Sequence, residues 1–152
     1  VVLPYRDLDA APALLDVVRR AARGRRLKVI LETGVLADEA AIGRACRIAL
    51  DAGADFLKTS TSRTRISTTP AAARLLLEAI AAHPRARARA GIKASGGIRT
   101  VAEAAIYIGL VADLLGAQAL VPQRFRLGAS ALLDDIESVL GGRPVPADDR
   151  PY

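Results

Sequence analysis

The sequence predicts an α/β fold of the (β/α)₈ TIM-barrel class, with about five consecutive β/α units, strands four to eight of the barrel, in this chain. Short apolar runs alternate with amphipathic segments along the 152 residues. Strands that are separated by helices must run parallel. A complete barrel needs about 250 residues, so five of its eight units would need about 156. An open doubly wound sheet is the alternative, but no glycine-rich nucleotide loop follows the first predicted strand.

Local signals set the boundaries of each element. We predict strands at 1–5, 27–32, 54–60, 90–94 and 117–121, and helices at 8–24, 38–53, 69–83, 100–116 and 130–141. Asp38 suits an N-cap, and Thr100 with Glu103 suits a capping box. We expect residues 1–141 to form the partial barrel domain. Residues 142–152, which are rich in proline, are expected to form a flexible C-terminal tail.

Composition narrows the class of protein. Apolar residues make up 51% and charged residues 25%, which is typical of a globular chain. The lone Cys46 rules out an internal disulfide and a cysteine-based zinc site, and the lone His83 argues against a histidine-rich metal site. We expect a cytoplasmic protein without a membrane partner, because no apolar run could span a bilayer and no signal peptide is evident. The net charge of +6 does not indicate nucleic-acid binding, because the nineteen arginines are scattered and lack an aromatic platform.

The three lysines fall where lysine is unusual. Lys28, Lys58 and Lys93 each lie in a predicted parallel strand, whereas the predicted helix faces carry arginine. Such strands are normally apolar, and buried lysine is rare. Lys28 is interpreted as an edge residue that reaches solvent. Lys58 and Lys93 fall at nearly the same height on consecutive strands, so each should lower the other's pKa. One amine then becomes a nucleophile suited to a Schiff base with a carbonyl substrate.

Two glycine-bearing turns predict an anion site. Gly96 and Gly97 lie between a strand and a helix, and Gly128 and Ser130 precede the last helix. Turns of this kind expose backbone N–H groups that can hold a phosphate, and phosphate sites recur after strands seven and eight of such barrels. Two ordinary turns are the alternative. Glu32 ends a strand at the same face, where it would contact substrate or act as a cap.

Four motifs carry a family resemblance. LKVILETG, AGADFLKTSTSR, GIKASGGIRT and FRLGASALL, in this order and spacing, resemble deoxyribose-phosphate aldolases, and VVLPYRDL is similar to that family's fourth strand. The resemblance covers the chain from Val1 to about Leu140. It implies a class I aldolase that cleaves 2-deoxy-D-ribose 5-phosphate to acetaldehyde and D-glyceraldehyde 3-phosphate, with no metal or other cofactor. The expected partner is the sugar phosphate, and a homodimer is expected of the full-length protein.

The resemblance also implies residue roles. Lys58 matches the Schiff-base lysine, and Lys93 matches a second lysine that perturbs the first and assists proton transfer. Tyr152 corresponds to a C-terminal tyrosine that, in some members, reaches the site to move a proton. The implied substrate- and phosphate-binding positions are Thr61, Ser62, Gly96, Gly97, Gly128 and Ser130.

The chain departs from the family pattern in several places. Ser62 stands where the family usually has glycine, Ala94-Ser95 replaces Pro-Ala, and Ala131 replaces a common serine. The family's catalytic aspartate precedes the two valines with which this chain begins, and the chain has no methionine. We therefore expect a fragment of a longer enzyme. Alone, it should fold poorly and be nearly inactive, because an open barrel segment exposes its edges and interior.

Three other functions stay open. A different Schiff-base lyase or a transaldolase-like enzyme would be distinguished by a panel of phosphorylated sugars. A non-catalytic half barrel would bind phosphorylated metabolites without forming an imine. DNA binding through the arginines would weaken steeply with salt.

Overall fold

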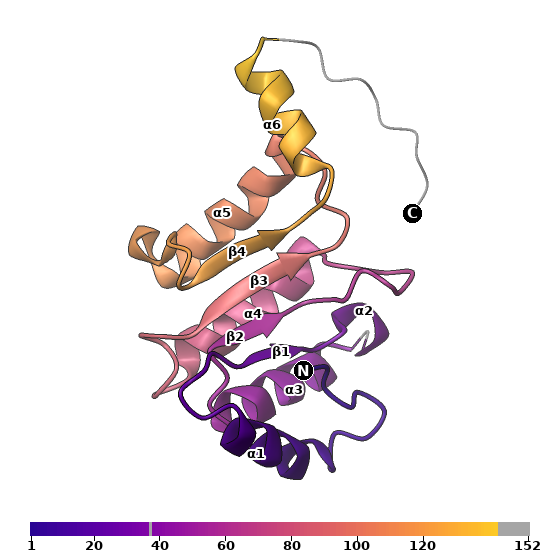
Figure 1. The fold of residues 1–152 in the computed structure, drawn as a ribbon, viewed down its shortest axis with the longest axis vertical. Coiled ribbons are helices and arrows are strands. Elements are labelled where there is room, and N and C mark those ends of the chain that lie inside the picture. Colours follow the sequence, from indigo (N-terminus) through magenta and orange to yellow (C-terminus); the bar gives the residue numbers. More distant parts are fainter. Residues whose placement is uncertain (37, 143–152) are drawn as a thin grey trace.

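The fold is a parallel sheet whose strand order follows the sequence. The computed structural model describes residues 1–36 and 38–142. Four strands pair in the order β1-β2-β3-β4, and every pair is parallel (Figure 1). The strands are β1 (Lys28–Ile30), β2 (Phe56–Lys58), β3 (Gly91–Ser95) and β4 (Phe125–Gly128). The helices are α1 (Ala11–Ala21), α2 (Thr33–Leu36), α3 (Glu39–Asp51), α4 (Pro70–Ala82), α5 (Val101–Leu115), the 3₁₀ turn η1 (Ala117–Ala119) and α6 (Leu132–Leu140).

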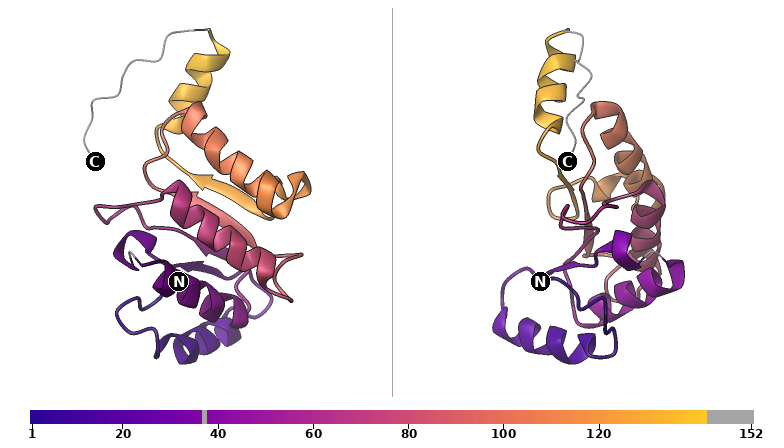
Figure 2. Two further views of the ribbon diagram at one scale, coloured as in Figure 1. Left: turned by 180° about the vertical axis from the view of Figure 1, so that it is seen from behind. Right: turned by 90° about the vertical axis from the view of Figure 1, so that its right-hand side faces the viewer.

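Helices cover one face of the sheet. Helices α3, α4 and α5 pack side by side behind the strands, as Figures 1 and 2 show. The strand residues Val29, Leu57 and Ile92 share a face and are at most 1% exposed in the apolar core. Among the described residues, no helix lies in front of β2 and β3 in Figure 1. A doubly wound sheet carries helices on both faces, so this one-sided layer indicates a barrel segment.

The first residues extend the sheet beyond β1. Val2 forms an isolated parallel bridge with Ile30. Leu3 N donates to Ile30 O at 2.8 Å, and Ile30 N donates to Val1 O at 2.8 Å. The strand predicted at 1–5 is therefore present only as a bridge. Pro4 has no N–H to continue the pairing, and the chain turns directly after it.

The prediction of a strand at 117–121 is wrong. Ala117–Ala119 form a 3₁₀ turn, and the last strand is β4. A short apolar run does not distinguish strand from helix by its period alone. Backbone N–H groups of Arg124 and Phe125 both donate to Val121 O at 2.8 Å, closing a turn immediately before β4. Strand β4 lacks a clear signal in the sequence because Arg126 interrupts its apolar pattern.

The helices lie where the sequence predicts them, with ends one to three residues shorter. Asp38 caps α3 by accepting from the N–H groups of Ala40 and Ala41. Thr100 and Glu103 form the predicted capping box of α5. The short helix α2, directly after β1, is not predicted by the sequence pattern.

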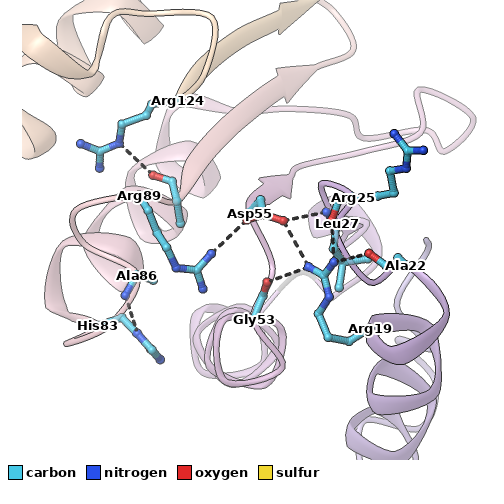
Figure 3. Close-up of polar contacts among 11 residues, drawn as sticks. Arg19, Ala22, Arg25, Leu27, Gly53, Asp55, His83, Ala86, Arg89 and Arg124 are labelled. Atoms are coloured by element: carbon cyan, nitrogen blue, oxygen red, sulfur yellow. Dashed lines mark hydrogen bonds and ion pairs between the residues drawn. The ribbon is translucent and has the colours of Figure 1, made fainter.

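A polar cluster holds the amino-terminal ends of the strands together. The Asp55 carboxylate accepts from Leu27 N at 2.8 Å, from Arg89 Nη1 at 3.0 Å and from Arg19 Nη1 at 3.3 Å (Figure 3). Arg19 also donates to the Ala22 and Arg25 carbonyls, each at 2.5 Å. These contacts tie α1, β1 and the loop before β3 to the start of β2. Asp55 therefore belongs to the end of the sheet opposite the carboxyl ends of the strands.

Candidate active site

The pairing of strands places two lysines side by side. Lys58 on β2 is the register partner of Lys93 on β3, and Lys93 is in turn the partner of Arg126 on β4. Register partners in a parallel sheet share a face and lie on strands about 4.8 Å apart. Because Leu57 and Ile92 face the helices, these cationic side chains lie on the face without helices. This geometry agrees with the equal heights that the sequence predicts for Lys58 and Lys93.

The aromatic ring of Phe56 lies on the same face of the sheet, beside the cationic side chains of Lys28 and Arg126. Lys28 is the register partner of Phe56. The Lys28 ammonium lies 5.7 Å from the centre of the Phe56 ring, and the Arg126 guanidinium lies 4.7 Å from it. Phe56 is only 1% exposed although no helix covers this face. Cation–π contacts of this kind stabilise the cations beside the ring. Four positively charged side chains share this face of the sheet, namely Lys28, Lys58, Lys93 and Arg126.

The electrostatics of the face lower the pKa of the Lys58 amine. Burial lowers the pKa of Lys58 most, the ammonium of Lys93 lowers it further, and Lys28 adds a smaller lowering. The Glu32 carboxylate acts in the opposite direction. The pKa of Lys28 is lowered by burial, then by Lys93 and Arg126. Like charges and desolvation both disfavour the protonated form, which is the condition for a nucleophilic lysine.

The loop after β2 holds the Lys58 amine. Lys58 Nζ donates to the Ser60 carbonyl in a short hydrogen bond. The turn at residues 60–62 is closed by Ser62 N, which donates to Ser60 Oγ at 2.9 Å. Thr61 donates to the Glu32 carboxylate through both its N–H, at 2.5 Å, and its hydroxyl, at 2.6 Å. Thr61 and Ser62, which the sequence analysis places at the site, therefore belong to the turn that positions this amine.

The loop after β3 approaches the same turn. Gly96 has φ 97 and is buried, and Gly97 follows with φ 83 and is exposed. A Cβ at Gly96 would collide with Ser67 and would lie 2.9 Å from Ser62 Oγ. The two loops can approach this closely because residue 96 has no side chain. Ser67 has no signal in the sequence beyond its place just before the cap of α4.

The end of β4 lies close to Lys93. A Cβ at Gly128 would lie 2.6 Å from Ser95 Oγ and 2.7 Å from Lys93 Cε. Gly96 N donates to Gly128 O at 3.3 Å, which joins the two glycine-bearing turns. Ser130 is exposed just ahead of α6. The structure thus brings Lys58, Lys93 and the three loops to one end of the sheet, whereas Tyr152 lies outside the described residues.

The donor groups of the site suit an anion rather than a metal ion. Over residues 1–36 and 38–142, no three histidine, cysteine or acidic side chains gather as a metal site would require. The face offers cations, serine and threonine hydroxyls and glycine-bearing turns. An amine with lowered pKa beside such groups can add to the carbonyl of an anionic substrate.

Comparison with known proteins decides the family. A sequence model described as DeoC/LacD family aldolase matches residues 12–136, which is most of the chain. The chain belongs to the DeoC/LacD aldolase family. Deoxyribose-phosphate aldolase of Agrobacterium fabrum is 42% identical to it over 154 residues. That alignment covers 97% of this chain and 58% of the relative.

Solved structures of similar proteins share the fold of this DeoC/LacD family member. A candidate deoxyribose-phosphate aldolase from Toxoplasma gondii ME49 superposes with a TM-score of 0.80 at 25% identity, over 95% of this chain and 59% of that one. The tetrameric deoxyribose phosphate aldolase from Aeropyrum pernix gives 0.68 at 27% identity, over 90% and 52%. The chain thus spans between half and three fifths of these relatives. The matches confirm the resemblance and the partial TIM-barrel fold that the sequence predicts.

In the part of the chain that the structure describes, no helix combines the length and the apolar character needed to cross a membrane.

Proposed function

We propose that the protein cleaves 2-deoxy-D-ribose 5-phosphate to acetaldehyde and D-glyceraldehyde 3-phosphate through an imine on Lys58. One observation carries the proposal. Lys58 is the register partner of Lys93 on the helix-free face, and its pKa is lowered by burial and by that neighbour. Membership of the aldolase family and the name of the Agrobacterium fabrum relative support the choice of substrate.

The proposed reaction begins at the Lys58 amine. Its lone pair adds to the C1 aldehyde of the open-chain sugar, and loss of water leaves a protonated imine. The C3 hydroxyl then loses its proton, the C2–C3 bond breaks, and its electron pair moves toward the iminium nitrogen. Glyceraldehyde 3-phosphate leaves. The remaining enamine takes a proton at C2, and water then releases acetaldehyde and the free amine.

Lys93 acts beside the nucleophile in this proposal. Its positive charge favours the neutral form of Lys58, and its ammonium can pass a proton to or from the reacting atoms. Arginine could supply the charge but could not pass the proton, because its guanidinium stays protonated. The tyrosine proposed to move a proton at C2, Tyr152, is outside the described residues, so its part in the reaction rests on the resemblance alone.

The proposed phosphate contacts lie at the carboxyl ends of the strands. In this proposal Gly97 supplies a backbone N–H and Ser130 a hydroxyl, while Gly96, Gly128 and Thr61 shape the turns around them. Remote contacts of this kind hold C1 against the amine and lower the barrier by fixing its position. Ser62 stands beside Gly96, and we assign it to the same phosphate region.

We extend the proposal to organisation and assembly. Residues 1–141 are proposed as one partial barrel domain of a cytoplasmic protein. The Aeropyrum pernix relative is described as a tetramer, and we propose that the protein assembles with further copies of itself, a homodimer being the simplest form.

The test is reductive trapping. The chain is mixed with 2-deoxyribose 5-phosphate and borohydride, and the adduct is located by intact mass and peptide mapping. We expect little turnover from the chain alone, but imine formation needs only the Lys58 amine, so we expect one reduced adduct, on Lys58. Lys58→Arg keeps the charge but has no nucleophile, so it should not trap, whereas Lys28→Arg should trap like the parent chain.

Other results of the same experiment contradict the proposal. An adduct on Lys28 or Lys93 in place of Lys58 would show that Lys58 is not the nucleophile. Binding of the sugar phosphate without any adduct would favour the non-catalytic half barrel. Trapping with other phosphorylated sugars but not with this one would favour another Schiff-base lyase.

A further inference from the structure

The Glu32 carboxylate is buried at the carboxyl end of β1. Its residue is only 4% exposed, and its backbone has φ 54, which is rare outside glycine. A carboxylate is costly to bury unless hydrogen bonds satisfy it. Both oxygens of Glu32 are used by Thr61, one by the N–H at 2.5 Å and one by the hydroxyl at 2.6 Å. The side chain therefore makes a two-point contact with a neighbouring loop.

This contact continues the pairing of β1 with β2 after the backbone ladder ends. Leu31 N donates to Lys58 O at 2.9 Å, and Thr33 N donates to Thr59 O at 3.0 Å. Beyond Thr59, the Glu32 side chain provides the next contact between the two segments, which it makes with Thr61. That bond therefore fixes the turn at 60–62 directly to the residue at the end of β1.

The turn in question holds the Lys58 amine. Lys58 Nζ donates to the Ser60 carbonyl, which belongs to the peptide group that also contains Thr61 N. The Thr61 N–H is the donor to Glu32. One peptide plane therefore connects the carboxylate on one side to the amine on the other. Moving that plane would move the acceptor that orients Lys58.

Strained backbone supports a functional reason for this arrangement. Among the described residues, Glu32 and Ser62 are the non-glycine residues with positive φ; Glu32 makes this contact, and Ser62 lies in the turn that it holds. Conformations of this kind cost free energy and persist where the surroundings hold them, often at active sites. The groups that act electrostatically on Lys58 are Lys28 and Glu32 from the β1 side and Lys93 from β3. Glu32 is the acidic member of that set.

We propose that Glu32 is a positioning residue, which fixes the turn at 60–62 and, through the Ser60 carbonyl, sets the orientation of the Lys58 amine. This inference rests on the proposed role of Lys58 as the nucleophile. Glu32 does not touch the reacting atoms in this proposal, and it acts only through the turn and through its charge.

Three variants separate the contact from the charge. Glu32→Ala removes both. Glu32→Gln keeps an oxygen acceptor and an amide group for Thr61 but removes the charge. Thr61→Val removes the hydroxyl partner and leaves the carboxylate in place. Glu78→Gln, on the exposed face of α4, removes one negative charge away from the site and serves as the matched control.

The first measurement does not depend on aldolase activity. Trace acetylation across pH, read by mass spectrometry, titrates each of the three lysines separately in the full 152-residue chain. Glu32→Gln and Glu32→Ala should lower the pKa of Lys58, because the carboxylate that raises it is gone. Lys28 should titrate as before in both, because Glu32 is not among the groups that shift it. Hydrogen exchange at Thr61 N should accelerate about tenfold or more in Glu32→Ala and change little in Glu32→Gln.

The second measurement uses the trapping reaction. In Glu32→Gln the pH profile of trapping should move to lower pH with its plateau kept. In Glu32→Ala the profile should move likewise and the plateau should fall about tenfold or more, since the amine loses its orientation. Thr61→Val should lower the plateau without moving the profile.

The outcomes are distinct for the two proposals. Unchanged Lys58 titration together with unchanged Thr61 exchange in Glu32→Ala would overturn the role of Glu32. An equal loss of plateau in Glu32→Gln and Glu32→Ala, without any shift of the profile, would also overturn it. Failure of the parent chain to trap at Lys58, with the titration and exchange effects present, would instead contradict the proposed function alone.

Discussion

Lys58 and Lys93 are direct register partners on the two central strands of the parallel sheet. Both side chains are partly buried on the face that carries no helix. Neither has an acidic register partner, because Lys58 also pairs with Ile30 and Lys93 with Arg126. The sheet geometry itself therefore holds like charges together, and this repulsion adds to the burial of Lys58, which lowers its pKa most.

Neutralising Lys93 should remove part of the lowering of the Lys58 pKa, since burial, its largest cause, remains. In Lys93→Gln we expect the pKa of Lys58 to rise, because the strongest like charge on it is removed. Lys28→Gln should raise it less, since Lys28 is the weakest of the named influences. Trace acetylation across pH measures both shifts. Lys58 titrating identically in the parent chain and in Lys93→Gln would show that the two ammonium groups do not interact.

The opposite end of the sheet should depend on Asp55. Asp55→Asn can keep the oxygen that accepts from Leu27 N and Arg19, but it then turns the other atom into a donor facing Arg89. We expect a loss of about 2 kcal/mol in the free energy of unfolding, because hydrogen bonds to a charged group are lost. Urea unfolding followed by circular dichroism measures it.

A second aspartate provides the control for that variant. Asp16 pairs with Arg20 within α1, at 2.6 Å, and both side chains are more than 60% exposed. Asp16→Asn should cost at most about 0.5 kcal/mol, as exposed helical pairs do. Equal losses in the two variants would contradict the idea that Asp55 ties the strand ends together.

Alkaline pH should destabilise the fold through Cys46. Burial raises the pKa of this thiol from 9.0 to about 12. The unfolded chain then loses the proton first, so the stability that the thiol contributes is fully present below pH 9 and is lost as pH rises toward 12. At pH 10 the loss is about 1.4 kcal/mol.

The variant Cys46→Ala isolates that effect from the other titrating groups. Its unfolding free energy should differ from that of the parent chain by a constant amount below about pH 8, because the thiol is then almost fully protonated in both the folded and the unfolded chain. The difference should shrink steadily above pH 9.5. A difference that is independent of pH between 7 and 10.5 would show that the thiol ionises equally in both states.

The sequence predicts the lysine pair because its signal is chemical and local. Lysine in an apolar parallel strand is rare, and the ends of consecutive parallel strands meet at one edge. The order of the strands and the equal heights of the two lysines then follow from the alternation of strands and helices along the sequence. The same reasoning places the glycine-bearing turns at that edge, although it says nothing of how closely Gly96 approaches Ser62 and Ser67.

The Glu32 contact is not predictable in the same way. It joins residues 29 positions apart and requires a positive φ at a glutamate, which no local pattern indicates. Strand β4 is a similar case. Its pairing places Arg126 beside Lys93, but the sequence segment is short, polar in the middle and preceded by an apolar run that forms a turn instead. Tertiary pairing decided both features.

Ser62 should be replaceable by glycine with a gain in stability. Its φ of 67 lies in the left-handed region, where a Cβ costs about 1 to 2 kcal/mol and glycine costs nothing. Glycine loses more conformational freedom on folding than alanine, which costs about 0.5 to 1 kcal/mol. Ser62→Gly should therefore be more stable than Ser62→Ala by about 0.5 to 1 kcal/mol. Both variants lack the hydroxyl, so the comparison isolates the backbone. At Ser138, inside α6, the order should reverse, because alanine favours a helix over glycine by about 1 kcal/mol. Urea unfolding of the four variants measures both pairs, and Ser62→Ala proving the more stable of its pair would contradict a left-handed backbone at this turn.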